Sequence, residues 1–198
     1  MRIGAVLIAV CLCLTLPGAA LAKKDQRDEL APPSSYVWVN PGLGLEYSQW
    51  LVGAIAWMAS TEEIVVYLTL EDDNDAARFE EEFWQRRDAD ASVLFGGVRQ
   101  TFNERSEAAD RRFGEGTRRG RKTDRGAIYV LYGEPTSVDF ETSAERTEPT
   151  LEVWSYDRVV EPGLDGRKPK QQFLFAKQGN KRHLIAGSLR RSRIRSRR

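Results

Sequence analysis

The sequence predicts an α+β protein in which amphipathic helices come first and a small, mainly antiparallel β-sheet follows. Three observations support this prediction. Between residues 60 and 113, apolar side chains recur at helical spacing. After residue 126 the pattern changes to short apolar or alternating runs, which are typical of strands. Gly, Pro and Asn residues that favour turns separate these later runs. Helices grouped ahead of strands are the order expected of an α+β domain.

The stretch before residue 60 carries weaker signals. Residues 36–39 (Tyr-Val-Trp-Val) suit a short strand, and the following Asn-Pro-Gly is a strong turn signal. Residues 51–58 are apolar without clean periodicity. Periodicity alone cannot decide between a buried helix and a strand there, so both remain open.

Two helices are predicted next. Ser60 can cap the first of them, and Glu63 stands at the position that completes a capping box. The second helix is expected over residues 74–87, with aromatic side chains along one face. Glu82 and Arg86 are four residues apart on its exposed side and should form an ion pair.

A third helix and the strands complete the prediction. The helix is expected over residues 98–113, with Gly114 at its C-terminal end. Residues 127–132 are almost continuously apolar, the pattern of a central strand buried on both faces. The remaining strands are expected at residues 137–141 and 151–156 and in a closing hairpin over residues 173–186.

Residues 1–22 have the organisation of a cleavable secretory signal peptide. Arg2 supplies a positive charge, residues 3–16 form an apolar run, and Ala20 and Ala22 are the small residues before a cleavage site. We therefore predict export through the Sec route, cleavage after Ala22, and a periplasmic or extracellular location. An uncleaved membrane anchor is the alternative, although the apolar run is shorter than the roughly 20 residues that span a bilayer.

Cleavage after Ala22 would change the chemistry open to the chain. It would remove both cysteines, Cys11 and Cys13, and so exclude disulfides, thiolate metal sites and a cysteine nucleophile. Of the 30 basic residues only Arg2 would be lost, which leaves 29 basic against 29 acidic residues.

A segment in the middle of the chain carries a family signature. It comprises Gly120, Arg121, Lys122, Thr123, Asp124, Arg125 and Gly126, followed by Tyr132, Gly133 and Pro135. It resembles the core of the GWxTD domain, a family of exported bacterial proteins whose biochemical role is uncharacterised. Segments 61–63, 79–88, 103–114 and 151–156 resemble other parts of the family in the same order. Two positions depart from the pattern, because Arg121 replaces the family's Trp and Glu134 replaces a Pro.

The resemblance implies a fold and an exported setting but no catalytic residues. It covers about residues 61–186, which leads to four expected parts. These are the signal peptide at 1–22, a flexible linker at 23–35, a single GWxTD-like α+β domain at 36–186 and a basic, disordered tail at 187–198.

The signature has a structural and a functional interpretation. In the structural interpretation, Thr123 and Asp124 accept hydrogen bonds from backbone N–H groups at a tight helix-to-strand junction, just before the predicted buried strand. Gly126 and Gly133 allow backbone geometries that other residues resist. In the functional one, Lys122, Asp124 and Arg125 line a polar site.

Other site chemistries find little support in the sequence. Residues 114–123 superficially resemble a phosphate-binding loop, but Arg121 separates Gly120 from Lys122 and the required strand–loop–helix context is missing. His183 is the single histidine and is expected at or near the surface. We therefore predict no metal site, no cofactor and no catalytic set. The weak alternative is a pair of carboxylates, Glu134 and Glu152.

The C-terminal segment is strongly basic. It is either a disordered solubilising tail or a contact for an unknown protein, an anionic envelope component or a membrane surface. Export disfavours nucleic acid as its partner. The leading functional hypothesis is an exported, non-enzymatic binding or scaffold module of the bacterial cell envelope, and the alternative is a carboxylate-dependent hydrolase acting on envelope polymers. The arginines concerned are Arg190, Arg191, Arg193, Arg195, Arg197 and Arg198.

Overall fold

The structure is a computed structural model that describes residues 38–90, 97–142, 150–159 and 161–185. Within these ranges, helices precede strands, as predicted. The helices are α2 (Leu45–Ser48), α3 (Ala54–Met58), α4 (Thr61–Leu68), α5 (Asp73–Asp90), α6 (Gly97–Phe113), the short 3-10 helix η1 (Gly120–Lys122) and α7 (Asp124–Tyr132). The strands are β1 (Ser137–Glu141), β2 (Leu151–Ser155), β3 (Gln172–Gln178) and β4 (Lys181–Leu184). The α+β class is therefore confirmed.

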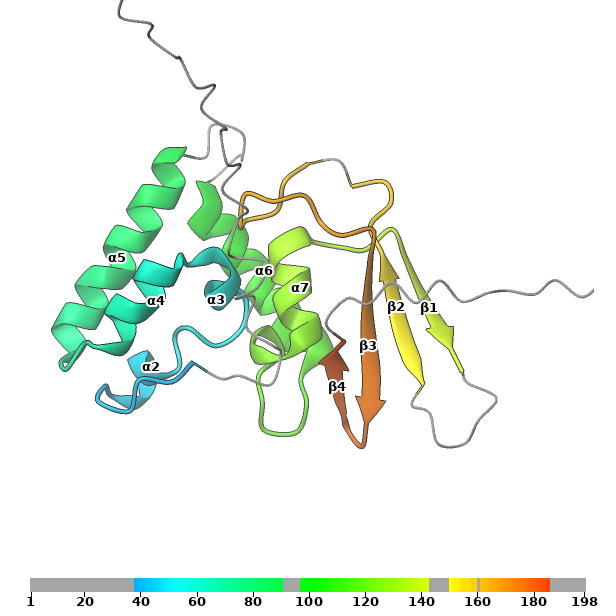
Figure 1. Cartoon of the computed structure of the whole chain (residues 1–198), viewed down its shortest axis with the longest axis horizontal. Coiled ribbons are helices and arrows are strands. Elements are labelled where there is room, and N and C mark those ends of the chain that lie inside the picture. The colour runs from blue at the N-terminus through cyan, green and yellow to red at the C-terminus, as the bar shows by residue number, and fades with distance from the viewer. Residues whose placement is uncertain (1–37, 91–96, 143–149, 160, 186–198) are drawn as a thin grey trace, which may run out of the picture.

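The strands form one antiparallel sheet in the order β1-β2-β3-β4. Each strand pairs with its neighbours in the chain, so β1 and β4 are the two edges. The helices lie on one side of this sheet, with α7 next to it and α5 farthest away (Figure 1). The fold thus has a helical layer and a sheet layer, with β1 at the margin most distant from α5.

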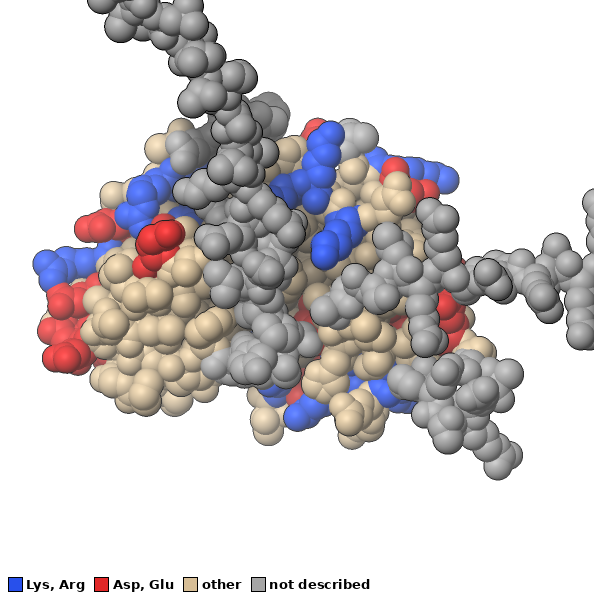
Figure 2. Space-filling model, in the orientation of Figure 1, with Lys and Arg blue, Asp and Glu red and all other residues tan. Residues whose placement is uncertain are grey.

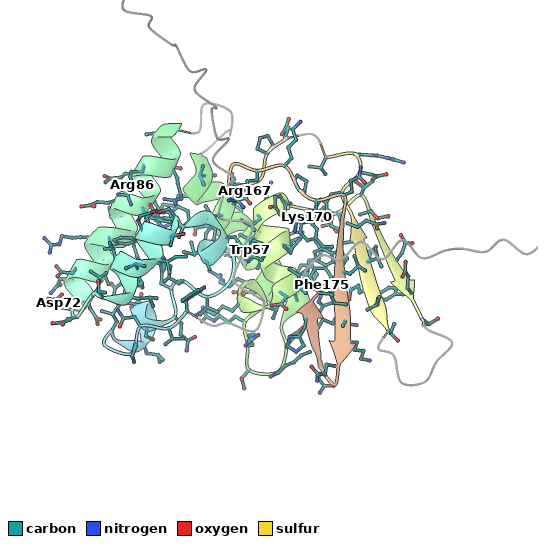
Figure 3. All side chains as sticks on the ribbon, viewed as in Figure 1. Trp57, Asp72, Arg86, Arg167, Lys170 and Phe175 are labelled. Atoms are coloured by element: carbon teal, nitrogen blue, oxygen red, sulfur yellow. The ribbon has the colours of Figure 1, made fainter. Side chains whose placement is uncertain are left out.

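The main core lies where α6 and α7 meet the sheet. The ring of Trp154 on β2 lies 5.2 Å from that of Phe113 on α6 and 5.0 Å from that of Phe175 on β3. Figure 3 shows Phe175 between β3 and α7, and its side chain is fully buried. Large aromatic surfaces buried in this way contribute much of the stability of a domain of this size.

The predicted helix signals are confirmed at residue level. The Ser60 side chain accepts a hydrogen bond from the Glu63 N–H, and the Glu63 carboxylate accepts one from the Ser60 N–H, which completes the capping box at the start of α4. On α5 the predicted pair Glu82 and Arg86 lies at 3.7 Å. Helix α6 ends at Phe113, directly before Gly114, as expected.

Residues 127–132 form most of α7, so the predicted buried strand at this position is wrong. The Ala127 N–H donates to the Thr123 carbonyl at 2.8 Å, which is a helical bond, and Gly133 ends the helix with φ of 77°. Ile128, Val130 and Leu131 are completely buried. A helix buried on most sides shows the same continuous apolar run as a buried strand, and only the cap at Thr123 distinguishes the two.

In the N-terminal part of the domain, the predicted strand is not found among the described residues, and the choice between helix and strand for residues 51–58 is resolved. Trp38 and Val39 belong to no strand, so the strand predicted over 36–39 is wrong for these two residues. Tyr36 and Val37 lie outside the described residues. Of the ambiguous stretch 51–58, the last five residues form α3 and the first three form turns.

The strands at 137–141 and 151–156 and the closing hairpin are confirmed, with β2 ending one residue earlier than expected. The expected signal peptide, the linker and the basic tail lie outside the described residues. Among the residues that the structure does describe, no helix is both long enough and apolar enough to cross a membrane.

Candidate functional site

The signature segment begins where η1 and α7 press against α6. A Cβ atom added to Gly120 would lie 1.8 Å from the carbonyl oxygen of Ala109, and one added to Gly126 would lie 1.8 Å from the carbonyl oxygen of Gly120. These separations are far below contact distance, so both positions need a residue without a side chain. The two glycines allow three backbone segments to pack closely.

Thr123 links η1 to α7. Its hydroxyl donates to the Gly120 carbonyl at 2.8 Å and accepts from the Gly126 N–H at 3.1 Å. The side chain is 1% exposed, so both bonds are shielded from water. Thr123 is therefore the N-cap of α7. The predicted local bonding is present, but the junction leads into a helix and not into the predicted strand.

Asp124 connects the start of α7 to β4, the edge strand nearest to the helices (Figure 1). Its Oδ2 atom accepts a hydrogen bond from the Leu184 N–H of β4 at 2.7 Å. The same atom lies 3.8 Å from Nδ1 of His183, whose side chain is 34% exposed. A carboxylate in the first turn also interacts favourably with the helix dipole. Asp124 thus holds a strand that lies 60 residues later in the chain.

Arg125 reaches a cluster of buried charges between α7, the sheet and the turn after α6. Its guanidinium lies 3.3 Å from Glu152 on β2 and 3.8 Å from Glu115. The side chains of both glutamates are at most 6% exposed. Arg182 on β4 contacts Glu152 at 2.6 Å, and its backbone N–H donates to Glu115 at 2.9 Å.

Every carboxylate in this cluster has at least one hydrogen-bond donor within the protein. Glu152 also accepts a hydrogen bond from the indole N–H of Trp154 at 2.8 Å. Removing one member of a buried ion pair is strongly destabilising, because it leaves the partner charge without compensation. The arrangement can position β2 and β4 against α7. It presents no carboxylate that is free of a cationic or N–H partner.

Arg121 and Lys122, which lie between Gly120 and Thr123, are half-buried. Arg121, at the position of the family's Trp, donates from its backbone N–H and from Nε to the Asp110 carboxylate on α6, both at 2.8 Å. Lys122 donates to the side-chain oxygen of Gln49 at 3.1 Å. Burial lowers the pKa of Lys122, and the nearby Arg119 and Arg121 lower it further. In this chain the side chain at the position of the family's Trp therefore makes an ionic contact with α6.

The end of the signature forms the exit from α7. The Tyr132 hydroxyl donates to Asp165 at 2.8 Å, and the Gly133 carbonyl accepts from the Tyr156 hydroxyl at 3.0 Å. Pro135 is half-buried in the turn that leads to β1. These contacts attach the C-terminal end of α7 to β2 and to the loop before β3.

A comparison of the sequence with known protein families gives a match. The sequence profile of the GWxTD domain matches residues 44–195, which is most of the chain. The chain belongs to the GWxTD domain family. Searches of the curated proteins and of the solved structures gave no match. The GWxTD match carries no assigned biochemical role, so the site has to be assessed from its own contacts.

The two weak candidate carboxylates of this GWxTD domain lie in different surroundings. Glu134 is exposed and pairs with Arg112 of α6, and this hydrogen bond lowers the pKa of Glu134. Glu152 is buried in the charge cluster described above. Among the described residues, no group of three or more His, Cys, Asp or Glu side chains is placed to hold a metal ion.

Sequence reasoning identified two of the four residues of the charge cluster. Arg125 was named from the signature and Glu152 from the predicted sheet. Glu115 and Arg182 were missed, because a turn residue and a strand residue 67 positions apart give no local signal that they meet. The one signal that they share in the sequence is a charged side chain close to a predicted boundary. Glu115 follows the predicted end of a helix, and Arg182 follows the predicted hairpin turn.

Proposed function

We propose that the protein is an exported binding or scaffold module of the bacterial cell envelope that acts without catalysis. The proposal rests on the observation that the signature residues form their polar contacts with other parts of the same domain. The polar groups of Thr123, Asp124 and Arg125 bond to helix, strand and buried carboxylate partners inside the domain. Residues used in this way maintain a fold and do not offer a reactive group to a substrate.

The exported setting rests on the sequence of the N-terminus. Residues 1–22 have the charge, apolar core and small residues of a signal peptide. Mass spectrometry of the protein from its native host would test this. A mature N-terminus at Lys23 in the periplasmic or culture fraction is expected, and intact Met1 in the cytoplasm would contradict the proposal.

A carboxylate-dependent hydrolase is the alternative function. Such enzymes need one carboxyl group that keeps its proton and donates it to the leaving group. Arg112 lowers the pKa of Glu134, which favours the ionised form and opposes that role. Glu152 is occupied by Arg125, Arg182 and Trp154. These contacts favour the binding or scaffold module.

A turnover assay separates the two functions. The purified protein would be incubated with envelope glycans, and the release of reducing ends would be measured. We expect wild type, Glu134→Gln and Glu152→Gln to give the same background signal as Glu104→Gln, an exposed control on α6. Turnover that disappears in a Glu134 or Glu152 variant with an unchanged circular dichroism spectrum would refute the module.

The proposed partner is an anionic envelope component or an acidic protein surface, contacted by the basic tail. Sedimentation with vesicles of phosphatidylglycerol and phosphatidylcholine would test the anionic surface. Replacing the six tail arginines with Gln should abolish binding, whereas replacing them with Lys should retain most of it because the charge is kept. Equal binding by the Gln variant would contradict a role for the tail.

A further inference from the structure

At β4, one of the two edges of the sheet, side chains of the helical part occupy the outward N–H groups. The Ile185 N–H donates to a carbonyl of β3 at 2.9 Å, so the N–H groups of Arg182 and Leu184 point away from β3. The Arg182 N–H donates to the Glu115 carboxylate at 2.9 Å. The Leu184 N–H donates to the Asp124 carboxylate at 2.7 Å. The β4 edge is therefore closed to pairing with a further strand.

At β1, the opposite edge, the hydrogen-bonding pattern shows which backbone groups point outward. The Tyr156 N–H, directly after β2, donates to the residue before β3 at 2.8 Å. Even-numbered residues of β2 therefore bond to β3 and odd-numbered residues bond to β1. The register joins odd-numbered residues of β1 to odd-numbered residues of β2. The N–H and C=O groups of Val138 and Phe140 thus point away from the sheet, and within the described residues β1 pairs with β2 alone.

Val138 and Phe140 also form an exposed apolar row. Their side chains are 43% and 63% exposed. Their partners across the sheet, Trp154 and Glu152, are buried and point toward the helical layer. Residues directly opposite each other in an antiparallel pair share a face, so the apolar row lies on the helical side of the sheet. The helical layer ends short of β1, and a strand added beside β1 would bury this row.

The other face of β1 is acidic. Asp139 pairs with Val153 and Glu141 with Leu151, so both carboxylates lie on the face away from the helices. All five residues of β1 are exposed, and acidic atoms are visible in Figure 2 at the margin where Figure 1 places β1. The edge therefore presents apolar side chains on one face and negative charge on the other.

These two rows define the chemistry of a partner. A second copy paired antiparallel through its own β1 would bring Asp139 and Glu141 beside the same carboxylates, which is unfavourable. An extended segment in which basic and apolar residues alternate matches both rows, because successive side chains of a strand point to opposite faces. Charge complementarity therefore favours a basic partner over a second copy of this chain.

We propose that the β1 edge binds an extended segment of a partner protein in which basic and apolar residues alternate, and that this segment joins the sheet as an additional edge strand. Its backbone bonds to Val138 and Phe140, and its apolar side chains cover the exposed row. Its Lys or Arg side chains face Asp139 and Glu141. This surface is separate from the basic tail, so the inference goes beyond the proposed function and depends neither on export nor on binding by the tail.

Fluorescence anisotropy with labelled synthetic peptides tests the edge. The probe is a short peptide in which Lys and Val alternate, and the full chain should bind it saturably. The control peptide has the same composition, but all its Lys residues precede all its Val residues. It should bind at least about tenfold more weakly, because it cannot match the two faces of β1 at once. Absence of binding, or equal binding of the two peptides, would overturn the proposal.

Two variants of the apolar row test the site itself. Val138→Pro removes an outward N–H at an edge position where Pro is tolerated, and it should weaken binding of the alternating peptide about tenfold without changing the circular dichroism spectrum. Val138→Thr with Phe140→Thr keeps the backbone donors and should weaken binding by a similar factor. The matched control is Val65→Thr with Val66→Thr, two exposed apolar residues on α4, which should bind like wild type. Unchanged binding by both β1 variants would contradict the site.

The acidic row is tested by charge removal and by the oligomeric state. Asp139→Asn with Glu141→Gln should weaken binding of the alternating peptide about fivefold, because exposed ion pairs contribute modestly. Glu71→Gln with Glu107→Gln removes the same charge from exposed positions in the helical part and should leave binding unchanged. Equal weakening by the two pairs would show attraction to net charge alone. A wild-type dimer in sedimentation that Val138→Pro converts to a monomer would assign the edge to a second copy, and either result would overturn the proposal.

Discussion

Glu80 on α5 provides the sharpest test of the electrostatics of the helical layer. Burial raises its pKa to about 7. The hydrogen bond from Tyr67 acts in the opposite direction, and the charge of Glu46 adds to the rise. The Tyr67 hydroxyl lies 2.9 Å from the Tyr47 carbonyl oxygen and 3.1 Å from the Glu80 carboxyl group. One hydroxyl proton cannot serve both acceptors. When Glu80 is protonated, it can donate to the Tyr67 oxygen, while Tyr67 donates to the Tyr47 carbonyl.

Replacing Glu80 with Gln should therefore mimic the protonated form. The folded protein binds the Glu80 proton more tightly than the unfolded chain does, because the folded pKa is the higher of the two. This contribution to the free energy of unfolding is fully present below about pH 4.5 and is lost as the pH rises through about 7. The full shift corresponds to about 3.4 kcal/mol, and partial exposure of the carboxyl group reduces this to about 1–2 kcal/mol.

Urea unfolding of wild type and Glu80→Gln between pH 5 and pH 8 measures this difference. The Gln variant should be close to wild type at pH 5 and about 1–2 kcal/mol more stable at pH 8. Glu82→Gln, on the exposed side of the same helix, is the control and should follow wild type at both values. If the free energies of unfolding of wild type and Glu80→Gln differ by the same amount at pH 5 and pH 8, the raised pKa of Glu80 does not contribute to stability and the reasoning is wrong.

Three further predictions concern stability and can be checked by chemical or thermal unfolding. Burial alone would raise the pKa of Glu63, but hydrogen bonds from Arg87 and the capping box bring it down to about 2. Glu63→Ala should therefore cost about 2–3 kcal/mol at pH 7, and the wild-type advantage should vanish as the pH falls from about 4.5 through 2. Gly120→Ala should cost about 3 kcal/mol or more through overlap with α6, whereas Gly114→Ala, with its nearest neighbours at 3.8 Å, should be tolerated. Thr123→Ala should cost about 1–2 kcal/mol through loss of the cap, and Thr123→Ser should recover most of it. Equal stabilities within any of these pairs would contradict the corresponding contact.

The sequence carried enough local information to predict most helices and strands. The capping box at Ser60 and Glu63 and the alternation along β2 depend on residues that are close together in the chain. Residues 127–132 were assigned wrongly because a continuous apolar run gains the same burial as a helix or as a strand. The cap that decides the matter, Thr123, stands just outside that run.

The chain by itself determined the family, the class of fold and the residues of the signature, since each of these depends on residue order and local spacing. Only the tertiary structure decided what the signature does. Asp124 meets Leu184, and Arg125 meets Glu115 and Glu152, across separations that no local pattern encodes. Buried charges require partners, and a partner can come from any part of the chain that the fold brings within a few ångströms. The pairing of these charges is therefore a property of the packed domain.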